Sequence, residues 1–334
     1  MNMEPESNSP PVGRPVAAWT KSGAATTTSS DHASPRPESN PVGVVLTTSA
    51  FLLWGILPLY WRVVDAVPSS QILAHRILWS AVLTGAISLV AFRRPLVEAV
   101  RSWRAARPMV VGGLLLGINW FTYIYAVTSG HVVEASMGYY INPLFSVVLG
   151  VLILRERLGT GEWVAFGFAA TGVLLLAIRL ARIPWIALVL TLTFGIYGLV
   201  KKRTSVPAVP ALAVETATLA PVALVYLILA PGAGDYMRDP LLAVFLLGAG
   251  LVTALPLYLF AEGARKIMLA AVGFLQYIAP TMTLAIGVLI FGEPFTRMHL
   301  ASFGLIWTGI VIFSLARSRR RGSRASRQGA RRPS

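Results

Sequence analysis

The sequence contains no cysteine and few charged residues, and both absences limit what the protein can be. Without cysteine it has no disulfide, no thiolate metal ligand and no cysteine nucleophile. Only 13% of the 334 residues are charged, about half of the fraction in an ordinary soluble protein, whereas 55% are hydrophobic. A soluble protein of this composition would have too little polar surface. The composition therefore predicts a membrane protein with several spanning segments.

Motifs for several other activities are also missing. No glycine-rich phosphate-binding loop occurs, so this chain does not encode ATP-driven pumping. The four histidines, at positions 32, 75, 131 and 299, are too dispersed to predict a metal site, and no nucleophile motif is paired with a base. We therefore expect no cofactor, no metal and no enzyme activity.

Lysine and arginine outnumber aspartate and glutamate by 29 to 14, but their positions do not indicate nucleic-acid binding. Eight arginines lie in the segment 317–332, and most other basic residues lie in short loops between apolar runs. Loops on the cytoplasmic side of membrane proteins have this composition. We expect membrane lipids and a small-molecule substrate as partners, and no nucleic acid.

The apolar runs predict an all-α integral membrane protein with ten transmembrane helices. These helices are expected at about 43–64, 70–92, 108–128, 131–154, 162–180, 184–201, 208–230, 241–262, 268–291 and 297–316.

Residues 1–40, which are rich in Ser, Thr and Pro, are predicted to form a disordered N-terminal tail. Residues 317–334 are predicted to form an Arg-rich cytoplasmic tail. In 93–107, apolar residues recur at helical spacing among arginines, which fits an amphipathic surface helix or a simple basic loop equally well.

Residues 132–172 and 269–309 are two versions of one segment, related by an offset of 137. From 140 to 172 the two versions share 12 identities in 33 positions without a gap. The matches include a proline, glycines and a glutamate, which shared apolar composition alone does not align. The chain is therefore predicted to contain two five-helix repeats, at 41–182 and 183–316.

A repeat with an odd number of helices must insert in the opposite orientation to its copy, so the repeats are predicted to be inverted. With the N-terminus inside, the inner loops hold twelve basic residues and the outer loops hold five. This bias predicts that both termini are cytoplasmic. Inverted repeats enclose substrate sites near the middle of the membrane.

Several segments along the chain resemble those of a known family. They include LWGILPLYWR (53–62), ILAHRILWS (72–80), GVLILRERL (150–158) and GFLQYIAPT (273–281). Together they resemble the EamA-domain branch of the drug/metabolite transporter superfamily, and are most similar to its RarD-type permeases, named for chloramphenicol sensitivity. The resemblance covers residues 43–316. It implies two five-helix repeats and a carrier in the bacterial inner (plasma) membrane whose substrates are poorly defined.

Ionisable and polar residues at membrane depth are candidates for the transport site, because burying them in hydrocarbon costs several kcal/mol. An offset of 140 aligns Trp54-Gly55 with Phe194-Gly195 and places His75 on Glu215, so these two are predicted to face one cavity. The candidate residues are Trp54, Tyr60, His75, Arg76, Asn119, Trp120, Tyr123, Glu134, Tyr140, Asn142, Glu215, Gln276 and Tyr277. Structural alternatives stay open: Arg76 snorkelling to headgroups, His75 bonding a carbonyl, and Glu134 facing its own helix dipole.

Two prolines and two glutamates recur in both repeats. Pro143 follows Asn142, and Pro280 follows the equivalent residue, Ala279. Both prolines are predicted to interrupt their helices, which leaves backbone carbonyls without their usual hydrogen bonds. Ordinary proline kinks are the alternative. Glu156 and Glu293 end the repeated GVLI segments, and structural roles as caps or ion-pair partners are favoured for both.

The sequence therefore predicts a secondary transporter that works by alternating access on a small metabolite or drug-like compound. His75 and Glu215 are hypothesised to titrate during the cycle and to couple export to protons. An integral-membrane enzyme acting on lipids and a non-transporting membrane scaffold or sensor are the alternatives.

The inverted arrangement predicts where reporter proteins will be found. A reporter fused directly after Glu156 should be cytoplasmic, and one fused directly after Glu293 should be on the outer side, because each ends the equivalent helix of oppositely inserted repeats. Paired reporters that are active on only one side of the membrane measure this. Finding both fusions in one compartment would refute the inverted arrangement.

Overall fold

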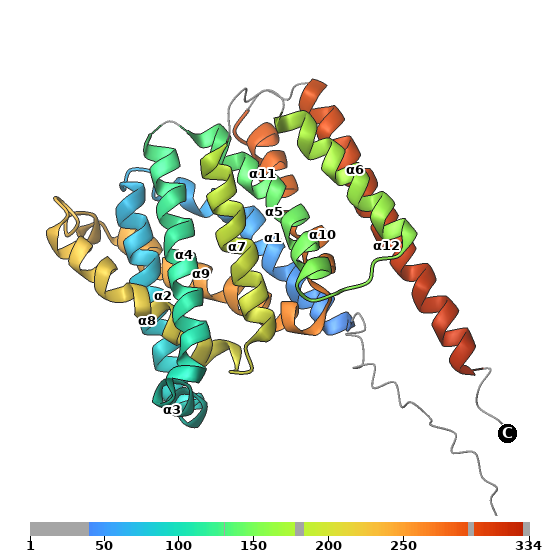
Figure 1. Cartoon of the computed structure of the whole chain (residues 1–334). Helices are drawn as coiled ribbons and strands as arrows, with labels where there is room; N and C mark the ends of the chain where they lie inside the picture. Colours follow the sequence, from blue (N-terminus) through green and yellow to red (C-terminus); the bar gives the residue numbers. More distant parts are fainter. Residues whose placement is uncertain (1–39, 130, 178–183, 293–296, 330–334) are drawn as a thin grey trace, which may run out of the picture. The chain divides into compact units, whose positions relative to one another are not determined.

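The computed structural model describes residues 40–129, 131–177, 184–292 and 297–329, and every regular element in these ranges is helical. The predicted disordered tail lies outside them, apart from Asn40. The elements are α1 (Pro41–Val63), α2 (Ser69–Ala91), α3 (Arg93–Arg101), α4 (Trp103–Thr128), α5 (Val132–Leu152), α6 (Thr160–Ala177), α7 (Trp185–Arg203), α8 (Ala208–Leu229), η2 (Tyr236–Arg238), α9 (Pro240–Lys266), α10 (Leu269–Gln276), α11 (Ile278–Leu289) and α12 (Arg297–Gly329) (Figure 1).

The ten predicted spans agree with the helices of the structure. Within the described ranges nine segments are long and apolar enough to cross a membrane, α10 and α11 together forming one of them, and α6 is a tenth, shorter apolar helix. The predicted all-α membrane fold is therefore confirmed. Residues 93–101 form helix α3, so the helical alternative for this segment is correct.

The last helix extends further than the sequence pattern predicts. The last span was expected to end near residue 316, but α12 continues to Gly329 and includes most of the Arg-rich segment. Arginine favours helix, and the first proline after this span is Pro333, so nothing in the backbone chemistry ends the helix at the membrane boundary.

Two helix starts follow directly from the sequence. Asn40 precedes Pro41, and its side chain accepts a hydrogen bond from the N–H of Val42 at 2.9 Å. Asp239 precedes Pro240 in the same way and accepts bonds from the first turn of α9 at 2.8 and 3.1 Å. In both places a capping residue is followed by proline at the first helical position, where the missing proline N–H costs no hydrogen bond.

The two repeated prolines have different effects on their helices. The second repeat is broken as predicted: α10 ends at Gln276 and α11 begins at Ile278, so that Pro280 lies in the first turn of α11. The predicted interruption at Pro143 is not found, because α5 continues through this residue. A proline removes one hydrogen bond and displaces one carbonyl. The packing of α5 against α7 and α10 holds the helix together across that defect.

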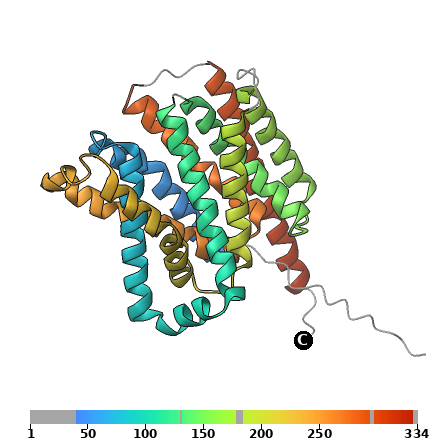
Figure 2. The same ribbon diagram turned by 60° about the vertical axis from the view of Figure 1, so that its left-hand side comes forward.

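Helices α6 and α12 lie side by side, and both views show them along one edge of the bundle (Figures 1 and 2). A Cβ added to Gly172 would lie 2.6 Å from the carbonyl oxygen of Ser302, and one added to Gly309 would lie 2.7 Å from that of Ala165. Adding 137 to Gly172 and to Ala165 gives Gly309 and Ser302, so the two contacts are equivalent in the two repeats. The contact pairs run in opposite directions along the two helices, so the equivalent helices of the two repeats are antiparallel.

Other equivalent residues contact each other directly across the two repeats. The rings of Trp54 and Phe194, related by the offset of 140, have centroids 5.8 Å apart. Tyr277 donates its hydroxyl to the carbonyl of Tyr140, its equivalent at the offset of 137, at 3.3 Å. Equivalent residues can meet only beside a two-fold axis. The described helices therefore form two inverted repeats related by a pseudo-two-fold axis, as the sequence predicts.

The α6–α12 contact predicts a sharp difference between two glycines of α12. We expect Gly309→Ala to destabilise the protein by about 1–3 kcal/mol, because its new methyl group would collide with the backbone of Ala165. Gly304→Ala is the matched control, since no atom lies within 4 Å of the methyl position, and it should be neutral or slightly stabilising. Equilibrium unfolding of the purified protein in detergent measures both. Equal effects would contradict the close contact.

Candidate functional site

Arg76 lies on α2 and its side chain reaches three other helices. Its Nε donates a hydrogen bond to the hydroxyl of Thr253 on α9 at 3.0 Å. The guanidinium carbon lies 4.9 Å from the ring centre of Trp61 on α1 and 5.3 Å from that of Trp120 on α4. Arginine is attracted to the faces of indole rings, so both contacts stabilise its charge within the bundle. The snorkelling alternative required Arg76 to extend to the lipid headgroups. Its side chain instead contacts residues of three neighbouring helices.

Two tyrosines complete this group. The rings of Tyr123 on α4 and Tyr139 on α5 have centroids 6.0 Å apart, and both residues are close enough to interact with the charge of Arg76. Tyr139 is 44% exposed. We call these residues the Arg76 cluster: Trp61, Arg76, Trp120, Tyr123, Tyr139 and Thr253.

A second polar group is closed off completely. Lys201 on α7 and Glu215 on α8 form an ion pair with 2.6 Å between Nζ and Oε1, and Tyr197 donates its hydroxyl to Oε2 of Glu215 at 3.1 Å. The three residues are 0%, 1% and 0% exposed, respectively. Lys201 and Tyr197 are four residues apart and so share one face of α7. We call this group the buried triad.

Helix α4 packs directly onto the buried triad through two glycines. A Cβ added to Gly113 would lie 2.5 Å from the carbonyl oxygen of Glu215, and one added to Gly112 would lie 3.0 Å from its Oε1. Any larger residue would push α4 away and let lipid or water reach the ion pair. The lysine and the glutamate therefore neutralise each other in a site where neither is solvated, and their separation would leave a buried charge.

His75 and Glu215 are not brought together. His75 is buried, and its Nδ1 accepts a hydrogen bond from the Trp79 indole one turn along α2 at 3.2 Å. The hydroxyls of Thr84 and Thr216 lie 3.3 Å apart. Glu215, which precedes Thr216, therefore lies at the depth of Thr84, in the C-terminal half of α2. Nine residues of helix, about 13 Å, separate that level from His75. The two residues thus occupy two different depths, as equivalent positions of inverted repeats should, and the partner of Glu215 is Lys201.

Two candidate glutamates each cap a helix that is distant in the sequence. The carboxylate oxygens of Glu156 accept hydrogen bonds from the N–H groups of Leu269 at 2.6 Å and Ala270 at 2.9 Å, in the first turn of α10. Glu134 accepts one from the N–H of Ile186, in the first turn of α7, at 2.8 Å. These N–H groups have no partner within their own helix, and a carboxylate also favours the positive end of the helix dipole. Glu134 thus caps a different helix from the one that carries it, and Glu156 caps α10 from the connection between α5 and α6.

Lys202 strengthens the cap at Glu156. Its ammonium group lies 3.9 Å from Glu156 and donates hydrogen bonds to the carbonyls of Ala264, at 3.3 Å, and Ile267. These contacts tie the end of α7 to the connection between α9 and α10. Glu293, the equivalent of Glu156 in the second repeat, lies outside the described residues.

Two further candidates form hydrogen bonds between helices. The amide nitrogen of Asn119 donates to the carbonyl of Leu190 and to the hydroxyl of Thr193, at 2.9 Å each. Tyr60 donates its hydroxyl to the carbonyl of Phe245 at 2.5 Å. Asn119 therefore joins α4 to α7, and Tyr60 joins α1 to α9. Their positions do not place them in the Arg76 cluster.

The remaining candidates on α5 and α10 are buried. Asn142 is 3% exposed, and its Oδ1 has no hydrogen-bond partner among the described residues. It lies one turn along α5 from Tyr139, on the same face. Gln276 is also buried, at the break between α10 and α11. An unsatisfied buried amide oxygen is costly, which makes Asn142 a candidate to contact a polar ligand.

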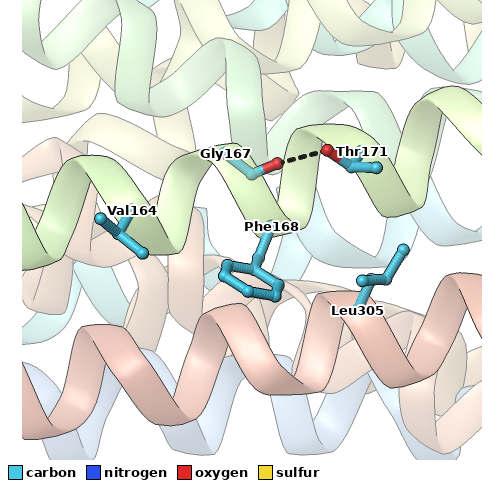
Figure 3. A pocket seen from close by; sticks show the side chains of 5 residues that line it. All are labelled: Val164, Gly167, Phe168, Thr171 and Leu305. Atoms are coloured by element: carbon cyan, nitrogen blue, oxygen red, sulfur yellow. Dashed lines mark hydrogen bonds between the residues drawn. The ribbon is translucent and has the colours of Figure 1, made fainter.

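The open groove in Figure 3 is separate from all of these groups. It has a volume of about 340 Å³ between α6 and α12 and is lined by Val164, Gly167, Phe168, Thr171 and Leu305. Its one hydroxyl, on Thr171, donates to the carbonyl of Gly167 within α6 at 2.9 Å. The groove is therefore apolar and offers a polar substrate no partner. The Arg76 cluster is the better candidate site.

Comparison with known proteins agrees with the inverted-repeat fold. The EamA-like transporter family matches residues 41–178 and again residues 182–315. The chain belongs to the EamA-like transporter family. The two matched segments correspond to the two repeats, so the predicted resemblance is confirmed, and transport across a membrane is the general function.

Individual relatives support the same assignment. The uncharacterized transporter YojE of Bacillus subtilis is 43% identical over 286 residues, which cover 82% of this chain and 94% of that protein. Protein RarD of Streptomyces exfoliatus is 40% identical over 81% of this chain and 88% of its own. Protein RarD of Escherichia coli K12 is 36% identical over 81% and 93%. A solved structure described as "Crystal structure of protein" has a TM-score of 0.64 at 20% identity, over 83% of this chain and 98% of that chain, and shows the fold alone.

Sequence reasoning missed several residues of this EamA-like transporter. Lys201 was counted among the basic residues of a cytoplasmic loop, because it begins a Lys-Lys-Arg run, but it is fully buried. The offset of 140 places Lys201 on Trp61, a residue inside a predicted span, and this match could have indicated its depth. No sequence signal pointed to Tyr197 or Thr253, whose contacts depend on helices far apart in the chain.

The buried triad predicts a strong dependence of stability on charge balance. We expect Lys201→Met or Glu215→Gln alone to lower the free energy of unfolding by about 3–5 kcal/mol, because each leaves one buried group without its partner. The double variant should recover most of that loss. Asp235→Asn removes an exposed ion pair with Arg238 and should change stability by less than about 1 kcal/mol. Unfolding in detergent measures the four variants, and additive losses in the double variant would contradict the buried pair.

Proposed function

We propose that this EamA-like transporter is a secondary carrier that works by alternating access. The observation that carries this proposal is the contact of equivalent residues from two inverted repeats, such as Gly172–Ser302 with Ala165–Gly309. When two inverted halves have nearly the same packing, exchanging their conformations gives a second state of similar energy that opens to the other side. A carrier needs two such states, whereas a scaffold does not.

The cargo of the proposed carrier is a small amphipathic metabolite or drug-like compound. The Arg76 cluster supports this, because it combines aromatic faces with a polar centre and draws its residues from α1, α2, α4, α5 and α9. Most small-molecule sites have such a composition, with largely apolar walls and a few polar groups. The names of the relatives, which are transporters, favour a carrier over a lipid-modifying enzyme.

Export coupled to protons is the mechanism that the buried titratable groups favour. Protonation of Glu215 would remove one charge of its pair with Lys201 and weaken the contact between α7 and α8. Loss of that contact would free two helices of the second repeat to move relative to each other. His75, at another depth of the bundle, is a second titratable group on the same proposed route. We place the carrier in the bacterial inner membrane with both termini in the cytoplasm.

The test combines cells and purified protein. Metabolites inside and outside cells with and without this protein are compared by mass spectrometry, and compounds that differ are then assayed in proteoliposomes with and without a pH gradient. Chloramphenicol is included because one relative is named a chloramphenicol-sensitive protein. We expect the wild type to accumulate at least one compound several-fold when the gradient is imposed.

The variant Lys201→Met/Glu215→Gln is the informative control for proton coupling, because it keeps the site neutral but cannot titrate. Its transport should continue without responding to the gradient. Identical transport by the wild type with and without the gradient would refute coupling. If no compound differs between cells and none is transported, the carrier proposal fails.

A further inference from the structure

Arg76 lies well inside the spanning helix α2 and forms no ion pair with a described acidic residue. No carboxylate of the described residues lies within ion-pair distance of its guanidinium group. Basic side chains at the ends of described spans that do have a carboxylate within 4 Å include Arg62, Lys201, Lys202, Arg265, Lys266 and Arg317. An unpaired arginine at membrane depth is costly, so its persistence needs a reason.

Most hydrogen-bonding capacity of Arg76 is unused. A guanidinium group has five N–H donors, and the described structure uses only Nε–H, in the bond to Thr253. The other four have no hydrogen-bond partner among the described residues. The bond to Thr253 and the two indole faces hold the planar group in one orientation. The free edge of Arg76 is thus a preorganised fork for two oxygen atoms.

The walls around this fork are aromatic. Trp61 and Trp120 flank the guanidinium group, and Tyr139 lies close enough to interact with its charge. Tyr123 and Tyr139 add hydroxyl groups that can donate a hydrogen bond to the same anion. Flat apolar groups bind well against such walls.

We propose that the Arg76 cluster binds an organic anion, a molecule with a flat apolar body and one carboxylate or similar oxyanion that pairs with the guanidinium fork. This inference deepens the proposed carrier function, because it names the charge and class of its substrate. The second repeat has no matching cation, since the offset of 140 places Arg76 on Thr216. The anion therefore pairs with an arginine of the first repeat and meets no equivalent arginine in the second.

The experiment uses three probes with one ring system: 1-naphthylacetate, 1-naphthylacetamide and 2-(1-naphthyl)ethylamine, which are anionic, neutral and cationic. Binding to the full-length protein in lipid nanodiscs is measured by calorimetry and by the shift in Tm. We expect the wild type to bind the acid about tenfold or more tightly than the amide and the amine, which is the order of magnitude for one enclosed charge pair. Equal binding of the three probes, or binding of none at millimolar concentration, overturns the proposal.

Variants identify the residue responsible. Arg76→Gln should weaken binding of the acid about tenfold or more and change binding of the amide by less than about twofold. Arg62→Gln is the matched control, because Arg62 is an exposed arginine at the end of α1 and its loss should leave the preference unchanged. If Arg76→Gln does not fold, Arg76→Lys keeps the charge without the planar fork and should bind the acid more weakly than the wild type. If the folded Arg76 variant still binds the acid as much more tightly than the amide as the wild type does, the proposal is overturned.

The outcomes separate this inference from the carrier proposal. Binding is measured without transport, so acid binding that depends on Arg76, together with no movement of labelled acid into proteoliposomes, would refute the carrier and keep the anion site. Transport that is unchanged by Arg76→Gln and selects a cation would refute the anion site and keep the carrier.

Discussion

The distance between the inverted repeats is set by glycine residues that face backbone carbonyls of the opposite helix. At Gly172 and Gly309 the space for a side chain is already filled by the neighbouring backbone, and the two contacts are images of each other. Membrane helices gain little from burying apolar surface against each other, since lipid is equally apolar, so close backbone approach contributes much of their association. The two-fold relation, and the meeting of Trp54 with Phe194 beside the axis, depend on this close packing.

The repeats share their fold but have diverged in their polar interior. In the second repeat Lys201 and Glu215 neutralise each other in a sealed site. In the first repeat the equivalent positions carry Trp61 and His75, and the neighbouring Arg76 stays open on one edge. A symmetric scaffold therefore holds two chemically different sites at two depths.

Much of the fold was predictable because its signals are local or repeated along the chain. Apolar runs located the spans, Asn40-Pro41 and Asp239-Pro240 mark helix starts, and the aligned repeats implied the inversion. Predictions of helix ends were wrong where they relied on a local sequence rule alone. Pro143 does not end α5, since neighbouring helices hold both sides of it. The helix of the last span continues beyond residue 316 to Gly329, because helix formation does not require lipid.

By itself the sequence determined the class, the number of spans, the inverted repeats and the family, because hydropathy and internal similarity need no knowledge of contacts. Only the tertiary structure decided which charges meet. Glu215 pairs with Lys201, Glu156 caps a helix 113 residues away, and Arg76 has no acidic partner among the described residues. Pairing of this kind depends on the rotation and depth of each helix relative to its neighbours. A rotation by one residue turns a side chain by about 100°, which a hydropathy pattern does not resolve.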